Sequence, residues 1–123
     1  MEQIVLDTNI LIEILKANQD IVKKLKSTNA IYKISSISAM ELYFGALNKK
    51  ELTILKKFVN SFEIVNINEN ISMCGTDLTY KYAKSHGLHI ADALIAATTL
   101  ELGCKLFTLN TKDFHFIDNL SLL

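Results

Sequence analysis

Short apolar runs alternate along the chain with longer segments in which apolar residues recur every three or four positions. The runs are typical of buried β-strands, and the longer segments are typical of helices with one apolar face. Strands are predicted near residues 4–6, 31–36, 63–67 and 105–109, with a short edge strand within 114–123. Helices are predicted over residues 9–16, 20–26, 38–47, 51–62, 68–86 and 90–102.

Strands that are separated by helices need crossover connections, and these produce parallel strands with helices on both faces. The pattern therefore predicts a three-layer α/β/α fold around a mainly parallel sheet of four to five strands. Asn68 or Asn70 can cap the longest helix, and Gly87 and Gly103 supply the left-handed residue that ends a helix. No proline, repeat or linker-like segment interrupts the chain, so we expect a single domain over residues 1–123.

Half of the residues are hydrophobic, yet no apolar run approaches the ~18 residues that a membrane span needs. Met1-Glu2-Gln3 leads directly into a strand and leaves no room for a signal peptide. Cys74 and Cys104 lie in apolar segments and are expected to be small core residues. We therefore expect a reduced cytoplasmic protein without membrane contact.

The formal net charge is zero, which argues against a protein held to nucleic acid by bulk charge alone. Every basic residue is a lysine. Without arginine the chain cannot bind phosphate groups in the bidentate manner, although lysine can still act as a point charge.

Four places put an acid or an amide at a predicted element boundary within apolar sequence. Asp7 follows the first strand, Glu41 and Asp92 lie in the first turns of two helices, and residues 110–113 follow the fourth strand. Asp7 alone is explained as a helix N-cap. Asp92 alone is explained by its favourable interaction with a helix dipole.

The other acidic and amide positions also have plain structural interpretations. Ser38-x-x-Glu41 matches a capping box, in which Glu41 reaches back to the backbone of the cap residue. Asn110 and Asp113 fit an Asx-type turn. Only their combination favours a functional site.

The carboxyl ends of parallel strands meet at one edge, where ligands bind in open α/β sheets. Asp7 and residues 108–113 emerge there, and Glu41 and Asp92 can face the same crevice. Clustered carboxylates raise one another's pKa, so they need a cation to remain ionised. Oxygen ligands favour Mg²⁺ or Mn²⁺ over zinc, and such ions promote phosphodiester hydrolysis.

Four segments together resemble the motifs of PIN-domain ribonucleases, and most closely those of VapC-type toxins from toxin–antitoxin pairs. They are residues 5–12 (VLDTNILI), 38–46 (SAMELYFGA), 90–98 (IADALIAAT) and 108–114 (TLNTKDF). The resemblance runs in order over nearly the whole chain. It implies the PIN fold and a metal-dependent endoribonuclease that leaves a 5′-phosphate and a 3′-hydroxyl.

The resemblance also implies roles for individual residues. Asp7, Glu41 and Asp92 would be catalytic and would hold Mg²⁺ or Mn²⁺, with Thr8 and Thr108 as supporting hydroxyls. These five positions match the family motifs directly. The fourth acidic position of the family falls on Asn110, and Asp113 is the possible substitute three residues later.

The same resemblance implies a homodimer and a cognate antitoxin protein that covers the acidic pocket. The apolar residues of the 44–62 segment are expected to be mostly core. Ile54 and Phe58 lie off the main inward stripe of that segment. We therefore expect Ile54 or Phe58 to contact the antitoxin.

Three alternatives remain open from the sequence. A haloacid-dehalogenase-like phosphatase would need a second Asp where this chain has Asn9. A zinc site of Cys74, His86 and His89 lacks a fourth ligand at motif spacing. A non-catalytic PIN-like module that binds RNA or protein would share the fold and would differ only in lacking cleavage.

Overall fold

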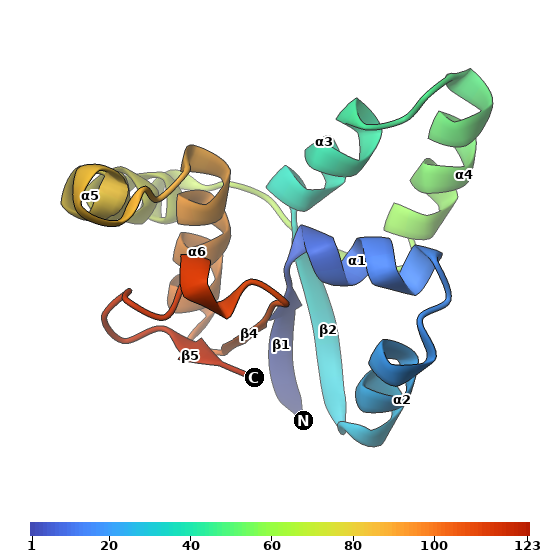
Figure 1. Ribbon diagram of the computed structural model, residues 1–123, viewed down its shortest axis with the longest axis horizontal. Coiled ribbons are helices and arrows are strands. Elements are labelled where there is room, and N and C mark those ends of the chain that lie inside the picture. Colours follow the sequence, from blue (N-terminus) through green and yellow to red (C-terminus); the bar gives the residue numbers. More distant parts are fainter.

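A five-stranded parallel sheet lies at the centre of the molecule, with its strands in the order β3-β2-β1-β4-β5. Figure 1 shows the computed structural model, which describes residues 1–123. The strands are β1 (Glu2–Leu6), β2 (Ala30–Ser35), β3 (Glu63–Val65), β4 (Lys105–Phe107) and β5 (Ser121–Leu122). The predicted mainly parallel sheet is confirmed, and every pairing within it is parallel.

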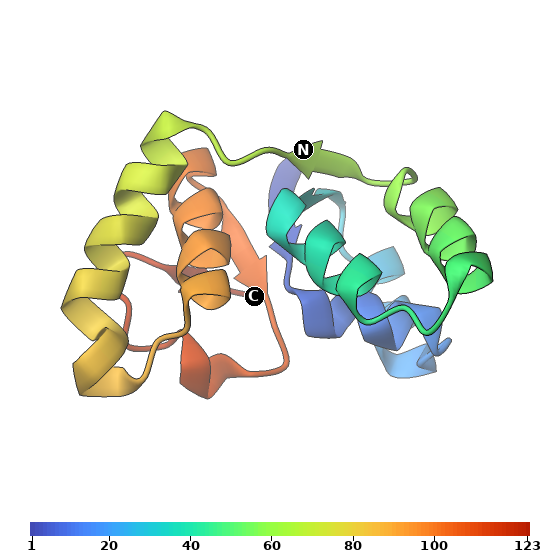
Figure 2. The ribbon, with the colours of Figure 1, turned by 90° about the horizontal axis from the view of Figure 1, so that it is seen from above.

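Helices cover both faces of the sheet, as the alternation of strands and helices predicts (Figure 2). The first four helices lie on one face, and the last two lie on the other. The helices are α1 (Thr8–Leu15), α2 (Gln19–Ser27), α3 (Ser36–Phe44), α4 (Lys49–Val59), α5 (Glu69–His86) and α6 (Ile90–Leu102). A single 3₁₀ turn, Thr111–Asp113, follows β4. No helix is both long enough and apolar enough to cross a membrane.

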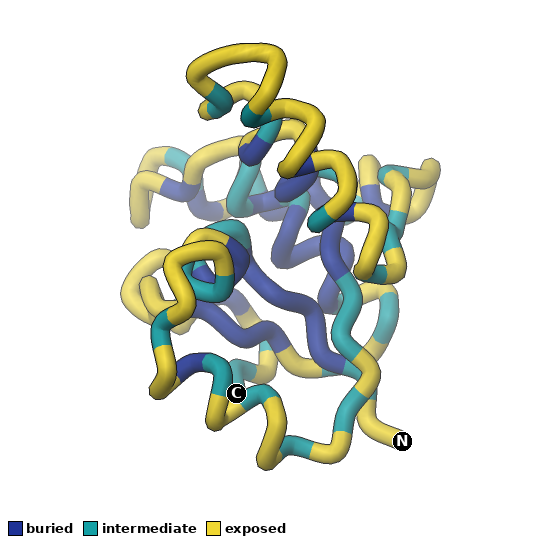
Figure 3. The backbone as a smooth tube through the Cα atoms, turned by 90° about the vertical axis from the view of Figure 1, so that its right-hand side faces the viewer, coloured by how far each residue is buried: buried dark blue, intermediate teal, exposed yellow.

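The sheet separates two apolar cores, and β1 contributes to both of them. Ile4 and Leu6 pack with the core under α1–α4, whereas Val5 packs with the core under α5 and α6. Successive side chains of a strand point to opposite faces, which explains the alternation. All three are fully buried, and Figure 3 shows buried backbone at the centre of the fold with exposed helices outside it.

Several predicted element ends agree with the structure. The side chain of Asn68 caps α5 by accepting a hydrogen bond of 2.9 Å from the backbone N–H of Ile71. Gly87 ends α5 at φ 68° and Gly103 ends α6 at φ 63°. Positive φ is readily accessible to glycine because it has no Cβ atom.

Several predicted boundaries are wrong. Strand β3 ends two residues earlier than predicted, at Val65, and helices α3 and α4 each end three residues earlier, at Phe44 and Val59.

Two further differences lie near the carboxyl edge of the sheet. Helix α3 begins at Ser36 and is capped by Ser35, so Ser38 is not a cap residue and the predicted capping box does not form. Strand β4 ends at Phe107, two residues earlier than predicted. The chain leaves the sheet there, and the N–H of Leu109 donates to Oδ1 of Asn9 at 3.2 Å instead of to a neighbouring strand.

Candidate active site

A pocket of about 240 Å³ lies at the carboxyl edge of β1, between the starts of α1 and α6 and the middle of α3. Its lining residues are Asp7, Thr8, Asn9, Ile12, Glu41, Asp92 and Asn110. The pocket therefore brings together three carboxylates that are far apart in the sequence. It also contains the side-chain amide of Asn110, which precedes the 3₁₀ turn.

Asp7 lies between β1 and α1, and each of its two carboxylate oxygens accepts a hydrogen bond. Oδ1 accepts a hydrogen bond of 2.8 Å from the N–H of Thr8, and Oδ2 accepts one of 2.8 Å from the hydroxyl of Thr108. Burial raises the pKa of Asp7, the two hydrogen bonds lower it, and the charges of Glu41 and Asp113 raise it further. Asp7 is thus the N-cap of α1 and also part of a charged cluster.

The hydroxyl of Thr108 is organised by two further hydrogen bonds. Its oxygen accepts from the N–H of Asn110 at 3.0 Å and from Nδ2 of Asn9 at 3.4 Å. A hydroxyl has two acceptor lone pairs and one hydrogen, so these donors direct the hydrogen of Thr108 toward Asp7. The sequence analysis did not assign a role to Asn9, although Asn9 directly follows the Asp-Thr pair.

Glu41 interacts with α1 and does not cap its own helix. The hydroxyl of Thr8 lies 2.7 Å from Oε1 of Glu41 and 2.8 Å from the hydroxyl of Ser38. This role of Ser38 does not follow from the sequence, because the spacing of Ser38 and Glu41 also fits a local capping box.

Asp92 lies in the first turn of α6 and is partly buried. Its pKa is raised to about 6, mainly by burial and further by the negative charges of Asp7, Asp113 and Glu41. The nearby charge of His89 acts in the opposite direction. His89 precedes α6 and makes no cap hydrogen bond through its side chain. The sequence places His89 only in the alternative zinc site and not beside the acidic pocket.

Asn110 and Asp113 take different positions relative to the pocket. Asn110 lines it directly, whereas Asp113 ends the 3₁₀ turn and is not part of the lining. The charge of Asp113 still raises the pKa of both Asp7 and Asp92. Both residues therefore remain candidates for the fourth position of the site. Asn110 would act by direct contact, and Asp113 would act through its charge.

The donor set suits a hard divalent cation that keeps part of its water shell. No three His, Cys, Asp or Glu side chains lie close enough together to hold one ion as a complete protein cage. Mg²⁺ is usually bound by one or two carboxylates with water in its remaining positions. Three carboxylates and an amide around one pocket fit that mode of binding.

The alternative zinc site does not form. His86 stacks on Phe116 at a centroid distance of 4.3 Å, and Cys74 packs against the core under α5 and α6. No metal-binding group of three includes them. Their positions are explained by packing.

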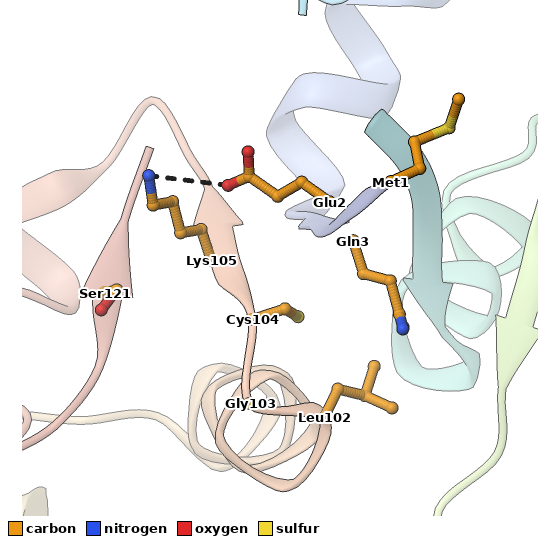
Figure 4. A pocket seen from close by; sticks show the side chains of 8 residues that line it. All are labelled: Met1, Glu2, Gln3, Leu102, Gly103, Cys104, Lys105 and Ser121. Atoms are coloured by element: carbon orange, nitrogen blue, oxygen red, sulfur yellow. Dashed lines mark ion pairs between the residues drawn. The ribbon is translucent and has the colours of Figure 1, made fainter. Parts of the chain in front are cut away.

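A second cavity, of about 340 Å³, lies at the opposite edge of the sheet (Figure 4). Its only carboxylate, Glu2, forms an ion pair of 3.5 Å with Lys105, which the dashed line marks. Buried Oε1 of Gln3 has no hydrogen-bond partner there. This cavity has no acidic cluster and does not resemble the pocket at the carboxyl edge.

The two residues expected to contact a partner differ in exposure. Ile54 is 57% exposed on α4. Phe58 is partly buried and packs edge to face against Phe62 at a centroid distance of 5.2 Å. Ile54 is therefore available at the surface, whereas Phe58 also contributes to the core.

Known proteins share both the sequence pattern and the fold. Ribonuclease VapC1 of Methanocaldococcus jannaschii is 32% identical over 115 residues, covering 92% of this chain and 79% of that protein. A toxin–antitoxin complex from Klebsiella pneumoniae contains a similar chain, with a TM-score of 0.78 and 29% identity over 94% of this chain and 93% of that one.

VapBC2 from Rickettsia felis, solved bound to a DNA fragment from its promoter, has a TM-score of 0.82 and 27% identity. The match covers 98% of this chain and 97% of that chain. The family model described as PIN domain matches residues 4–120. Because this match spans nearly the whole chain and every residue of the acidic pocket, the chain belongs to the PIN-domain family.

Proposed function

We propose that the chain is a divalent-metal-dependent endoribonuclease that hydrolyses RNA phosphodiester bonds at the pocket around Asp7. The meeting of Asp7, Glu41 and Asp92 from three separate elements is the observation that carries this proposal. Burial is the main cause of the raised pKa of Asp92, and the negative charges of Asp7, Asp113 and Glu41 contribute to it. A bound cation would offset this negative charge. Relatives named ribonuclease VapC support the reaction class.

Asp7, Glu41 and Asp92 would hold Mg²⁺ or Mn²⁺ together with part of the ion's water shell. When bound, the ion would activate water and neutralise charge on the phosphoryl oxygens. Thr8 and Thr108 keep Asp7 oriented through its two oxygens, so that each oxygen retains a free lone pair. Water attack at phosphorus with departure of the 3′-oxygen gives a 5′-phosphate and a 3′-hydroxyl.

Asn110 would contribute an uncharged donor at the wall of the pocket. An amide can donate to a phosphoryl oxygen without adding another negative charge to the cluster. Asp113 would act at longer range by raising the pKa of Asp7 and Asp92. This division of roles assigns direct contact with substrate to Asn110.

The proposed biological role is that of the toxin in a VapBC-type pair. The Klebsiella pneumoniae and Rickettsia felis structures are toxin–antitoxin complexes, and both match almost the whole chain. A cognate antitoxin would bind near the acidic pocket and contact α4 through Ile54 or Phe58. The active form would be a homodimer in the cytoplasm.

The test is end-mapping of total cellular RNA after incubation with the purified protein. Wild type is compared with Asp7→Asn and Asp92→Asn in Mg²⁺, in Mn²⁺ and in EDTA. Asp77→Asn is the matched control because Asp77 is an exposed aspartate on α5 outside the pocket. Discrete cuts with 5′-phosphates are expected from wild type and Asp77→Asn only when a metal ion is present.

The same comparison identifies the failures. Cleavage that persists in EDTA would contradict the metal requirement. Equal cleavage by wild type and Asp92→Asn would contradict the assigned residues. If wild type cleaves no RNA and binds Mn²⁺ as poorly as Asp7→Asn and Asp92→Asn do, a non-catalytic binding module would be favoured.

A further inference from the structure

Ser38 carries a buried hydroxyl that bonds toward the acidic pocket. The residue is 0% exposed, and its hydroxyl has one hydrogen-bond partner, the hydroxyl of Thr8 at 2.8 Å. The hydroxyl of Thr8 lies 2.7 Å from Oε1 of Glu41. Ser38 therefore reaches a carboxylate of the pocket through one intervening side chain.

The direction of the two hydrogen bonds follows from the chemistry of the groups. An ionised carboxylate can only accept, so the single hydrogen of Thr8 is donated to Glu41. The hydrogen between the two hydroxyls must then come from Ser38. Donation runs from Ser38 to Thr8 and from Thr8 to Glu41.

Two other fully buried hydroxyls, those of Thr98 and Thr99, behave differently. Thr98 and Thr99 on α6 donate to backbone carbonyls four residues earlier, at 2.7 and 3.0 Å. Such hydrogen bonds connect only residues of the same helix. Ser38 lies in α3 but bonds to α1, so its hydroxyl links two elements that line the pocket.

We propose that Ser38 is a positioning residue that holds Glu41 through the hydroxyl of Thr8. This inference rests on the proposed function, because Glu41 is assigned there as a metal ligand. Ser38 occupies an acceptor site of Thr8 and leaves Glu41 as the acceptor for the hydrogen of Thr8. Chains of hydrogen bonds strengthen one another, so the effect of Ser38 extends to the carboxylate.

The test is a double-mutant cycle on Mn²⁺ affinity, measured by electron paramagnetic resonance on the full chain. The proteins are wild type, Ser38→Ala, Thr8→Val and the double variant. Loss of a group that orients a ligand typically costs ~10-fold or more in metal affinity, and this loss is expected for Ser38→Ala. In the Thr8→Val background, Ser38→Ala should change the affinity less than about twofold, because residues acting through one another are not additive.

Two further variants separate positioning from stability. Thr99→Val removes an equally buried hydroxyl that bonds away from the pocket, so it is expected to lower Tm without changing Mn²⁺ affinity. Ser38→Thr keeps a hydroxyl and is expected to restore most of the affinity lost in Ser38→Ala. In cleavage assays Ser38→Ala should lower kcat more than it raises KM.

The outcomes distinguish this inference from the proposed function. Mn²⁺ binding by wild type but not Asp92→Asn, together with unchanged affinity in Ser38→Ala, would overturn the positioning role alone. Independent, additive losses in Ser38→Ala and Thr8→Val would also overturn it. Equally poor Mn²⁺ binding by wild type and Asp92→Asn would overturn both proposals.

Discussion

The hydroxyl of Thr108 donates a hydrogen bond of 2.8 Å to Oδ2 of Asp7, and these residues lie 101 positions apart in the chain. The contact follows from the register of the sheet, in which Leu6 pairs with Phe107. Asp7 and Thr108 are the next residues of the two strands and emerge side by side. The pairing of β1 with β4 therefore connects the first and last parts of the pocket.

Replacing Thr108 by valine is expected to raise the pKa of Asp7 further. The hydroxyl lowers that pKa at present, whereas burial and the charges of Glu41 and Asp113 raise it. The acidic limb of the kcat/KM profile should move to higher pH, so activity on that limb should fall below that of wild type at the same pH. The measurement is a pH–rate profile of RNA cleavage at saturating Mn²⁺.

Thr76→Val is the control for the loss of a threonine hydroxyl. Thr76 is exposed on α5 and donates to the carbonyl of Ser72 at 2.8 Å, away from the pocket. Its profile should coincide with that of wild type. An unchanged acidic limb in Thr108→Val would contradict the proposed influence of Thr108 on Asp7.

The metal-free protein is expected to lose stability as pH rises from about 4 to about 6. Asp92 has a pKa of about 6 in the folded chain, against an ordinary value of 3.8. Folding therefore favours the protonated form, and the free energy of unfolding falls as this carboxylate ionises. Asp92→Asn should raise the Tm of the metal-free protein by about 3 °C at pH 8 and have little effect at pH 4.

Thermal unfolding in EDTA at both pH values measures this effect. Addition of Mn²⁺ at pH 8 should raise the Tm of wild type and leave that of Asp92→Asn unchanged, because an ion that binds only the folded state stabilises it. An Asp92→Asn variant that is less stable than wild type at pH 8 in EDTA would contradict the prediction. The ionised carboxylate of Asp92 therefore lowers the stability of the metal-free protein, whereas the proposed metal binding requires it.

The sequence was sufficient to predict the layers of the fold and the approximate position of the pocket. Alternation of strands and helices sets the parallel sheet, and Asp7 and Asp92 lie at element boundaries that local rules detect. Those rules fail where a distant partner competes with a local one. Glu41 fits a capping box by spacing, yet it accepts from Thr8, which lies 33 positions earlier.

The contacts of Ser38 and Asn9 could not be read from the sequence for the same reason. Ser38 meets Thr8 across 30 positions, and Asn9 meets Leu109 across 100. Neither residue belongs to a spacing pattern that distinguishes a site residue from a turn or cap residue. Their roles depend on how α1 sits beside α3 and beside the end of β4.

Asn110 and Asp113 are expected to respond differently to substitution. Asn110 lines the pocket, so Asn110→Ala should lower kcat ~10-fold or more without moving the pH profile. Asp113 raises the pKa of Asp7 and Asp92, so Asp113→Asn should move the acidic limb of kcat/KM to lower pH. Its kcat at pH 8 should stay within a fewfold of wild type.

The two pH–rate profiles, measured side by side, check this prediction. Asp118→Asn is the control because Asp118 is an exposed aspartate in the same C-terminal region, paired with Lys81 at 3.0 Å. A greater loss of kcat at pH 8 in Asp113→Asn than in Asn110→Ala would reverse the assignment. Asp113 would then be the fourth catalytic residue.

Ile54→Ala and Phe58→Ala are expected to separate partner binding from stability. Ile54 is 57% exposed, so removal of its side chain should weaken binding of the cognate antitoxin and leave Tm nearly unchanged. Phe58 packs against Phe62, so Phe58→Ala should also lower Tm. Calorimetric titration with the antitoxin measures the affinity, and thermal melts measure Tm. Met73→Ala is the control because Met73 is exposed on α5. Unchanged affinity in both variants would exclude this face of α4 from the antitoxin interface.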